Sequence, residues 1–175
     1  MKLKHNIKQY QKKLKRFGKE IDKGMMSALN KTNTTMTTRT KRELSKISGL
    51  KQKDVGQFMS KQKATMMRMI SSIFVRGKAL NIYRFGAKQQ KRGVKAKPWN
   101  KPQLFKGAWI MNNRTVMIRT SKNRFPIRGV HGPSLKKEFT KNVLTSAFKK
   151  ASHSRFMTLF YKEMKFRKNK VFGTA

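Results

Sequence analysis

Residues that could perform acid–base or metal chemistry are scarce in this sequence of 175 residues. A metal-dependent nuclease needs several carboxylates that converge on Mg²⁺. Glu20 and Asp22, the closest pair of acids, are two positions apart and therefore point to different faces of a helix. The other acids are scattered along the chain, and the full set is Glu20, Asp22, Glu43, Asp54, Glu138 and Glu163.

The histidines also lack the pattern of a reactive site. His5, His131 and His153 do not have the spacing of metal ligands. Ser152 and Ser154 flank His153, but neighbours on a helix do not face each other, and a nucleophilic serine needs a base that a third group orients. We therefore expect a protein that is not an enzyme, with no catalytic, cofactor-binding or metal site and no cofactor.

Positive charge is the dominant feature of the composition. The chain has 45 Lys and Arg residues against 6 Asp and Glu, which gives a net charge of +39 spread over its whole length. A net charge of about 2–8 is enough to keep a small domain soluble. Lys and Arg contacts to phosphate release counterions, so binding to a polyanion would be strong, salt-sensitive and largely blind to sequence. The sequence therefore predicts a polyanionic partner, with DNA as the first candidate.

Cysteine usage and hydropathy bear on the compartment. The chain has no cysteine and so no disulfide framework. No apolar run reaches the roughly 18 residues that a membrane-spanning helix needs, and the basic N-terminal segment lacks the apolar core of a secretory signal. We expect an unprocessed, soluble protein in a reducing interior, or in a particle assembled there, with no membrane contact.

The elements that position these residues begin with one long helix. Apolar residues at alternating spacings of three and four predict an amphipathic helix over residues 2–47, which Gly49 ends. Whether this helix packs on a partner subunit or on the protein's own sheet is left open. Its predicted apolar face consists of Leu3, Ile7, Tyr10, Leu14, Phe17, Ile21, Met25, Ala28 and Leu29, and the stripe resumes at Leu44 and Ile47 after a weaker threonine-rich stretch, 32–40.

A short helix and several strands are predicted next. The helix covers residues 51–58, and β-branched and aromatic residues indicate strands over 69–75 and 80–85. The clearest element is a hairpin of residues 105–111 and 114–120, because Asn112-Asn113 suits the positive φ angles of a tight turn. A further strand, Arg124–Val130, is expected at a sheet edge because it contains Pro126.

The C-terminal part is predicted to be helical. Gly132-Pro133-Ser134 opens a helix, since proline suits its first position, and Ser152-His153-Ser154 interrupts it or leaves two helices. The fold class is therefore α+β, with a long N-terminal helix, a small antiparallel sheet with a hairpin, and a C-terminal helix or helix pair. The expected segments are 1–48 (helix), 49–132 (mostly antiparallel β core) and 133–175 (helical).

A basic loop over residues 86–102 is the predicted contact to nucleic acid. Glycines and a proline break this stretch, and loops of this length without their own structure are often functional. Flanking glycines let backbone and side chains approach phosphates closely. The alternative is an ordinary solvated surface loop. The candidate contact residues are Lys88, Lys91, Arg92, Lys95 and Lys97.

Three stretches, which together span about residues 28–135, resemble a known family. They are Ala28-Leu29-Asn30-Lys31 leading through Arg39, Lys41-Arg42 and Leu44 to Ser48-Gly49-Leu50-Lys51; Phe85-Gly86-Ala87-Lys88-Gln89-Gln90-Lys91-Arg92-Gly93-Val94-Lys95-Ala96; and Phe125-Pro126-Ile127-Arg128-Gly129-Val130-His131-Gly132-Pro133-Ser134. Their order and spacing resemble the minor tail protein Z family of tailed bacteriophages, whose members are called tail completion proteins. The Lys-rich N-terminal helix and the extended C-terminal helix depart from the family pattern.

This resemblance implies a structural virion protein at the head-proximal end of a phage tail, assembled in the host cytoplasm. Members of the family act late in tail assembly and make the tail competent to join a filled head. The implied partners are the tail terminator and tape measure proteins, DNA in the tail or neck lumen, and further copies of the chain in a homo-oligomeric ring.

A ribosomal or ribosome-like RNA-binding structural protein is the alternative function. Lys-rich helical arms on a small α+β core are typical of that class. Co-fractionation with ribosomal subunits would favour it, whereas co-purification with tails or virions would favour the tail protein.

Overall fold

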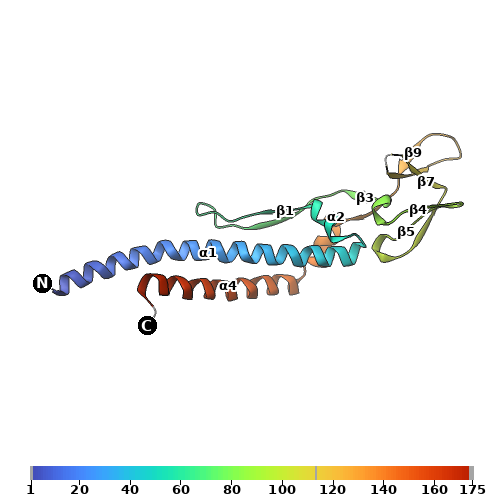
Figure 1. The fold of residues 1–175 in the computed structure, drawn as a ribbon. Helices are drawn as coiled ribbons and strands as arrows, with labels where there is room; N and C mark the ends of the chain where they lie inside the picture. Colours follow the sequence, from blue (N-terminus) through green and yellow to red (C-terminus); the bar gives the residue numbers. More distant parts are fainter. Residues whose placement is uncertain (1, 113, 174–175) are drawn as a thin grey trace. The chain divides into compact units, whose positions relative to one another are not determined.

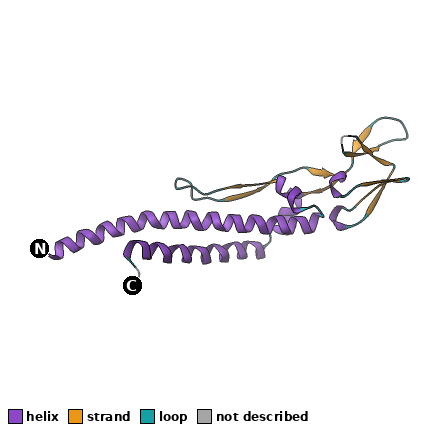
Figure 2. Cartoon of the chain, in the orientation of Figure 1, coloured by secondary structure: helices purple, strands orange, loops and turns teal. Residues whose placement is uncertain are grey.

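The computed structural model describes residues 2–112 and 114–173, with side chains from Ile7 onward. The fold is α+β, as predicted, with a long N-terminal helix, small antiparallel sheets and a long C-terminal helix (Figure 1; Figure 2). The helical elements are α1 (Lys2–Ser48), α2 (Gln52–Gln57), η1 (Ile82–Phe85), η2 (Pro98–Asn100), α3 (Leu135–Glu138), the π-helical turn η3 (Phe139–Val143) and α4 (Ser146–Phe172). The strands are β1 (Met59–Gln62), β2 (Ser72–Val75), β3 (Ala79–Asn81), β4 (Lys88–Gln90), β5 (Gly93–Ala96), β6 (Gln103–Lys106), β7 (Ala108–Met111), β8 (Thr115–Arg119), β9 (Ile127–Gly129) and β10 (His131–Ser134).

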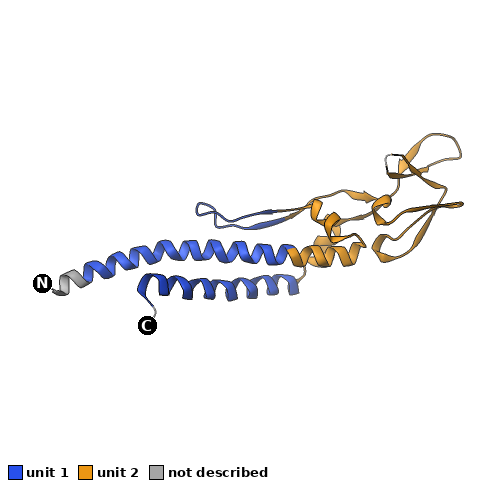
Figure 3. Ribbon diagram, viewed as in Figure 1, with its two compact units in different colours: residues 1–37, 61–73, 146–175 blue, residues 38–60, 74–145 orange. Residues whose placement is uncertain are grey.

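Residue contacts group the chain into two compact units (Figure 3). Each unit combines segments that are far apart in the sequence, and α1 contributes to both. The predicted segments 1–48, 49–132 and 133–175 are consecutive in sequence, so these units do not test them and the division stays a prediction. Unit 1 comprises residues 1–37, 61–73 and 146–175, and unit 2 comprises residues 38–60 and 74–145.

α1 confirms the long helix that the apolar spacing predicts, and Gly49 follows it in the left-handed conformation with φ of 79°. Buried positions recur every four residues from Glu20 to Ser48. Because a helix turns by about 100° per residue, each four-residue step rotates the buried face by about 40°. Successive turns of α1 therefore face different neighbours, and no single stripe serves the whole helix.

The predicted apolar stripe of α1 is accordingly covered only in part. Ala28 is fully buried, whereas Ile7, Tyr10 and Leu14 are more than half exposed. Leu3 lies outside the described side chains. The first described turns of the helix thus carry apolar side chains that the described part of the chain leaves uncovered.

The threonine-rich stretch 32–40 carries the buried face of α1 mainly with polar side chains: Thr32, Asn33, Met36 and Thr40 are buried, whereas residues 34, 35, 38 and 39 are exposed. Thr32 and Thr40 are among the few buried polar residues. The hydroxyl of Thr32 donates to the carbonyl oxygen of Ala28 at 2.8 Å, so burial leaves this hydroxyl paired. Small side chains here let other segments approach the helix closely.

Two asparagines of α1 hold the hairpin that connects β1 to β2. Asn30 donates to the carbonyl of Ala64 at 3.0 Å and accepts from the amide of Ala64 at 2.8 Å. Asn33 donates to the carbonyls of Gln62 at 2.9 Å and Ser72 at 3.2 Å. Because a buried amide costs free energy unless it is paired, these bonds specify where the hairpin lies on α1.

In unit 1, α4 packs along α1. Gly24 allows this close approach, because a Cβ at that position would overlap the side chain of Met164 and lie 3.1 Å from Cδ of Arg167. Phe17 and Phe172 meet edge to face with ring centroids 5.4 Å apart. α1 therefore packs against a helix of its own chain, which neither of the two predicted alternatives, a partner subunit or its own sheet, included.

Ion pairs occupy the same contact between α1 and α4. Arg167 places Nη1 2.6 Å from Oε2 of Glu20 and Nη2 3.4 Å from Oε2 of Glu163. The pKa of Glu20 is lowered, first by its hydrogen bond from Lys23, and the pKa of Glu163 is lowered, first by its hydrogen bond from Lys31. Both carboxylates are thus held ionised between the helices.

Unit 2 is built from small antiparallel sheets. Their strand orders are β4-β5-β6, β7-β8-β9 and β10-β3. β9 pairs with β8 alone, so the predicted edge position of this strand is confirmed, and α2 confirms the short helix predicted after Gly49. The largest fully buried apolar side chains of the unit, apart from its prolines, are Leu44, Val55, Ile82, Val94, Val116 and Leu135.

The predicted hairpin forms between β7 and β8 but is shorter than expected. Met111 pairs with Thr115, so three residues, 112–114, separate the strands, and Arg114 takes a left-handed φ of 58°. Asn113 of the predicted turn lies outside the described residues. Gly107, with φ of 69°, separates β6 from β7, so the predicted first strand is divided between two sheets.

The predicted strand over residues 80–85 is wrong in its second half. β3 ends at Asn81, whose side-chain oxygen accepts the amide of Tyr83 at 3.0 Å and starts the 3-10 turn η1. Such a local bond offers the backbone an alternative to a sheet ladder. Gly86 then closes the turn in the left-handed conformation with φ of 69°.

The predicted start and interruption of the C-terminal helix are also wrong. Pro133 lies in β10, where the register with β3 shifts, and two-stranded sheets tolerate a proline because every strand is an edge. Helical structure starts at Leu135, and the break falls at residues 144–145, between η3 and α4. α4 runs unbroken through Ser152-His153-Ser154.

Candidate polyanion-binding site

The predicted basic loop over residues 86–102 is in fact largely a β-hairpin. β4 and β5 pair in register, with Lys91 and Arg92 in the turn between them, and η2 follows. The stretch forms strands because β6, which follows it in sequence, pairs with β5 and provides hydrogen-bond partners for the backbone groups on the edge of β5 that β4 leaves unpaired. Periodicity within the loop alone does not reveal this partner.

Strand register places three lysines on one face of the β4-β5-β6 sheet. Lys88 lies directly opposite Lys95, and Gly93, two residues before Lys95, lies opposite Lys106. Directly paired residues share a face of a sheet, as do residues two apart on one strand. All three lysines are exposed. The opposite face is packed inward, since Val94 is fully buried.

Like charges meet on this lysine face. Side chains directly opposite each other in an antiparallel pair have Cβ atoms about 4.5–5.5 Å apart, and like charges at that position are destabilising. No acidic residue occurs between Gly86 and Lys106 in the sequence. The β4-β5-β6 sheet therefore supplies no countercharge of its own to Lys88, Lys95 and Lys106, and an anion lying on this face would relieve the repulsion.

The five predicted contact residues do not form one cluster. All are exposed, but Lys88 and Lys95 lie on the sheet face whereas Lys91 and Arg92 form the tip of the hairpin. Lys97 follows β5 and lines a separate hollow. The structure therefore joins two of the five with Lys106, which was not predicted.

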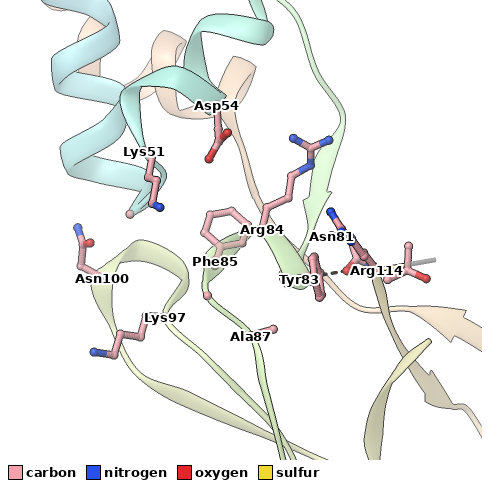
Figure 4. A pocket seen from close by; sticks show the side chains of 13 residues that line it. Lys51, Asp54, Asn81, Tyr83, Arg84, Phe85, Ala87, Lys97, Asn100 and Arg114 are labelled. Atoms are coloured by element: carbon pink, nitrogen blue, oxygen red, sulfur yellow. Dashed lines mark hydrogen bonds between the residues drawn. The ribbon is translucent and has the colours of Figure 1, made fainter. Parts of the chain in front are cut away.

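The hollow beside Lys97 has a volume of about 1080 Å³ and also lies within unit 2 (Figure 4). Its lining includes one acid, Asp54, among several cations. The guanidinium of Arg84 lies 5.3 Å from the ring centroid of Phe58, and its Nη1 donates to Gln57 at 3.4 Å. The cationic residues of the lining are Lys51, Arg84, Lys97 and Arg114.

Two residues of this hollow have strained backbones. Asn100 and Arg114 have φ angles of 57° and 58°, in the left-handed region that residues other than glycine rarely adopt. Asn100 is held there by a hydrogen bond from its side chain to the carbonyl of Lys46 at 2.5 Å. Strain of this kind gathers at functional positions, which adds weight to the cationic hollow as a place for anions.

Three of the acidic residues, Glu20, Glu138 and Glu163, are engaged in structural contacts. Glu138 accepts the indole N–H of Trp99 at 2.9 Å and the side-chain amide of Asn142 at 2.6 Å. Within the described residues, no three or more His, Asp or Glu side chains gather as a metal site would require. The described helices include none that is long and apolar enough to cross a membrane.

Sequence reasoning missed Lys106, Lys51, Arg84 and Arg114. Lys106 lies two residues after Leu104 on β6, so the two share a face, and the pairing of Leu104 with Lys95 puts Lys106 on the same face as Lys95. The other three come from separate elements that only tertiary packing brings to one hollow. No local pattern in the sequence marks them.

One family model, described as prophage minor tail protein Z, matches residues 3–169 of the chain. The match covers nearly the whole length and contains both the lysine face and the hollow. No curated protein and no solved structure matches the chain significantly.

Proposed function

The chain belongs to the prophage minor tail protein Z family, and on that premise we propose that it completes the head-proximal end of a phage tail, where it contacts DNA. Membership makes it a structural protein of the virion tail. The proposal adds the position near the head, a ring of several copies, and contacts with tail terminator and tape measure proteins. Assembly of the particle takes place in the host cytoplasm.

The lysine face of the β4-β5-β6 sheet is the observation that carries the DNA contact. Lys88, Lys95 and Lys106 lie together, exposed, with no acid in the surrounding sequence. A lumen through which DNA passes requires contacts that do not depend on base sequence, and lysine–phosphate contacts have that property. The hairpin tip, with Lys91 and Arg92, extends the same basic strand pair.

The first test measures DNA binding of a Lys88→Gln, Lys95→Gln, Lys106→Gln variant at several salt concentrations. Each phosphate contact contributes about 0.9 to the slope of log affinity against log salt. We expect the slope to fall by about 2–3, because all three lysines contact phosphates.

A variant with the same net charge is the control for that experiment. Lys149, Lys162 and Lys168 are exposed lysines of α4, and their replacement by glutamine removes equal charge from unit 1. We expect a change in slope of less than about 1. Equal losses in the two variants would show that only total charge matters and would remove the lysine face from the proposal.

Electron cryo-microscopy of the assembled virion tests the position. We expect several copies of the chain around the axis at the head-proximal end of the tail, with the lysine face toward the DNA. Copies located at the distal tip would contradict the position. Copies at the proximal end whose lysine face meets only solvent would contradict the DNA contact and leave the position standing.

A further inference from the structure

The apolar seam between α1 and α4 continues on α1 beyond the end of α4. Phe17 and Gly24 meet α4, and Ile7, Tyr10 and Leu14 extend this face toward the N-terminus at alternating spacings of three and four residues. The exposed fractions of these three side chains are 55%, 62% and 60%.

α4 itself does not cover this extension. It ends at Phe172, which packs against Phe17, and Gly173 follows with a left-handed φ of 85° and donates its amide to the carbonyl of Asn169 at 2.8 Å. A left-handed glycine of this kind is a common helix end. In Figure 1, α1 accordingly continues past the C-terminal end of α4. The seam is therefore built for a helix over a longer span than α4 occupies.

The shape of the exposed stripe favours a helical partner over a lipid surface. A repeat of three and four residues is the a and d pattern of a coiled-coil seam, which is narrow. A helix that lies in a membrane interface presents a wider apolar face. Beside the stripe, Lys8, Gln11 and Lys15 leave no apolar side chain to widen it.

Charge indicates the chemistry of that partner. Where α1 is covered, carboxylates meet cations across the seam, as in the pairs Lys31–Glu163 and Arg167–Glu20. Where α1 is uncovered, residues 7–19 contain six Lys and Arg residues and no acid. At this segment a second copy of the chain fits poorly, because it has only six acids, of which Glu20 and Glu163 are already paired within the chain, to meet these cations.

We propose that the segment Ile7–Phe17 of α1 binds an acidic amphipathic helix of a different protein, which continues the seam where α4 ends. Its apolar a and d residues cover Ile7, Tyr10 and Leu14, and its carboxylates pair with the flanking lysines as Glu163 pairs with Lys31. This contact goes beyond the proposed function, because it involves neither DNA nor the lysine face of unit 2.

A synthetic peptide of about three heptads, with Leu at a and d and Glu at the flanking positions, is the probe. Its affinity for the full-length chain is measured by calorimetry, beside a scrambled peptide of the same composition. We expect the Ile7→Ser, Tyr10→Ser, Leu14→Ser variant to bind the heptad peptide at least about tenfold more weakly than the unmodified chain. Its thermal unfolding is expected to stay unchanged, because these side chains are exposed in the free protein.

Two controls separate the seam from general attraction to anions. Replacing Tyr161 and Phe166, two exposed aromatic residues of α4, by serine is expected to leave the affinity for the heptad peptide within about twofold. The scrambled peptide is expected to bind more weakly than the heptad peptide, because it lacks the apolar seam. Equal binding of both peptides, or equal affinity of the triple variant and the unmodified chain, would overturn the proposal.

Phosphatidylglycerol vesicles provide the remaining arm of the experiment. The proposal expects the triple variant and the unmodified chain to bind these vesicles equally, since only charge attracts them. A loss of vesicle binding in the triple variant, without any preference for the heptad peptide over the scrambled one, would assign the stripe to a lipid surface instead.

Discussion

Replacement of Gly93 by alanine is expected to destabilise unit 2 by roughly 2–4 kcal/mol. Gly93 has φ of 143°, and a Cβ there would overlap the carbonyl oxygen of Phe105 and lie 3.0 Å from Cα of Lys106. Both contacts are to backbone atoms of the neighbouring strand β6, so no side-chain movement can relieve them. The strand pair must separate or the backbone at position 93 must change.

Gly86→Ala is the matched control for this substitution. Gly86 also has a positive φ, 69°, but a Cβ there meets nothing within 4 Å. Only the backbone penalty of roughly 1–2 kcal/mol is then expected. Chemical denaturation followed by circular dichroism measures both variants. Similar losses for the two would mean that the close approach of β5 and β6 contributes little to stability.

The lysine face provides a second readout for Gly93→Ala. Because the pairing of β5 with β6 places Lys95 and Lys106 on one face, separation of the two strands is expected to lower the salt slope of DNA binding even though no charge is removed. An unchanged slope would show that the lysines act independently of the sheet.

Acidification is expected to weaken the packing of α1 against α4. The pKa of Glu20 and that of Glu163 both lie below their ordinary value of 4.5, first because of the Lys23 hydrogen bond for Glu20 and of the Lys31 hydrogen bond for Glu163. A carboxyl whose pKa is lowered on folding stabilises the folded state above its unfolded pKa. This contribution is therefore complete above about pH 4.5 and is lost as the pH falls through the lower folded-state value.

Glu163→Gln tests the acid dependence directly. At neutral pH we expect this variant to lose about 1–3 kcal/mol of unfolding free energy, because it removes the charged acceptor of Lys31 and Arg167. Below the folded-state pKa the difference between variant and unmodified chain is expected to shrink. The measurement is the unfolding free energy between neutral pH and pH 3.

Asp22→Asn is the control for Glu163→Gln. Asp22 is exposed on α1, two residues from Glu20, and no ion pair holds it among those the structure records. We expect little change in stability at any pH. A pH profile of Glu163→Gln that runs parallel to that of the unmodified chain would exclude this ion pair as the source of acid sensitivity.

Local patterns predicted the elements whose period is long and unbroken. Apolar residues at alternating spacings of three and four predicted α1 to within one residue of its end. The order of a long helix, strands and a further helix then indicated the α+β class. Predictions failed where a single polar side chain or a distant strand decided the backbone. Asn81 turned the end of a strand into a 3-10 turn, and β6 turned a supposed loop into a hairpin.

The amino-acid sequence was enough to identify the class of protein. The net charge of +39 and the scarcity of acids and histidines came from composition, and the order of three motifs indicated the phage tail family that the family model matches. Net charge is a sum over residues, and the spacing of apolar residues is a local property, so both are available from the sequence without a structure. Tertiary structure alone decided that Lys106 joins Lys88 and Lys95, and that α4 stops short of Ile7. Both depend on pairing between residues distant in sequence, and no local pattern encodes which partner a strand or a helix face will find.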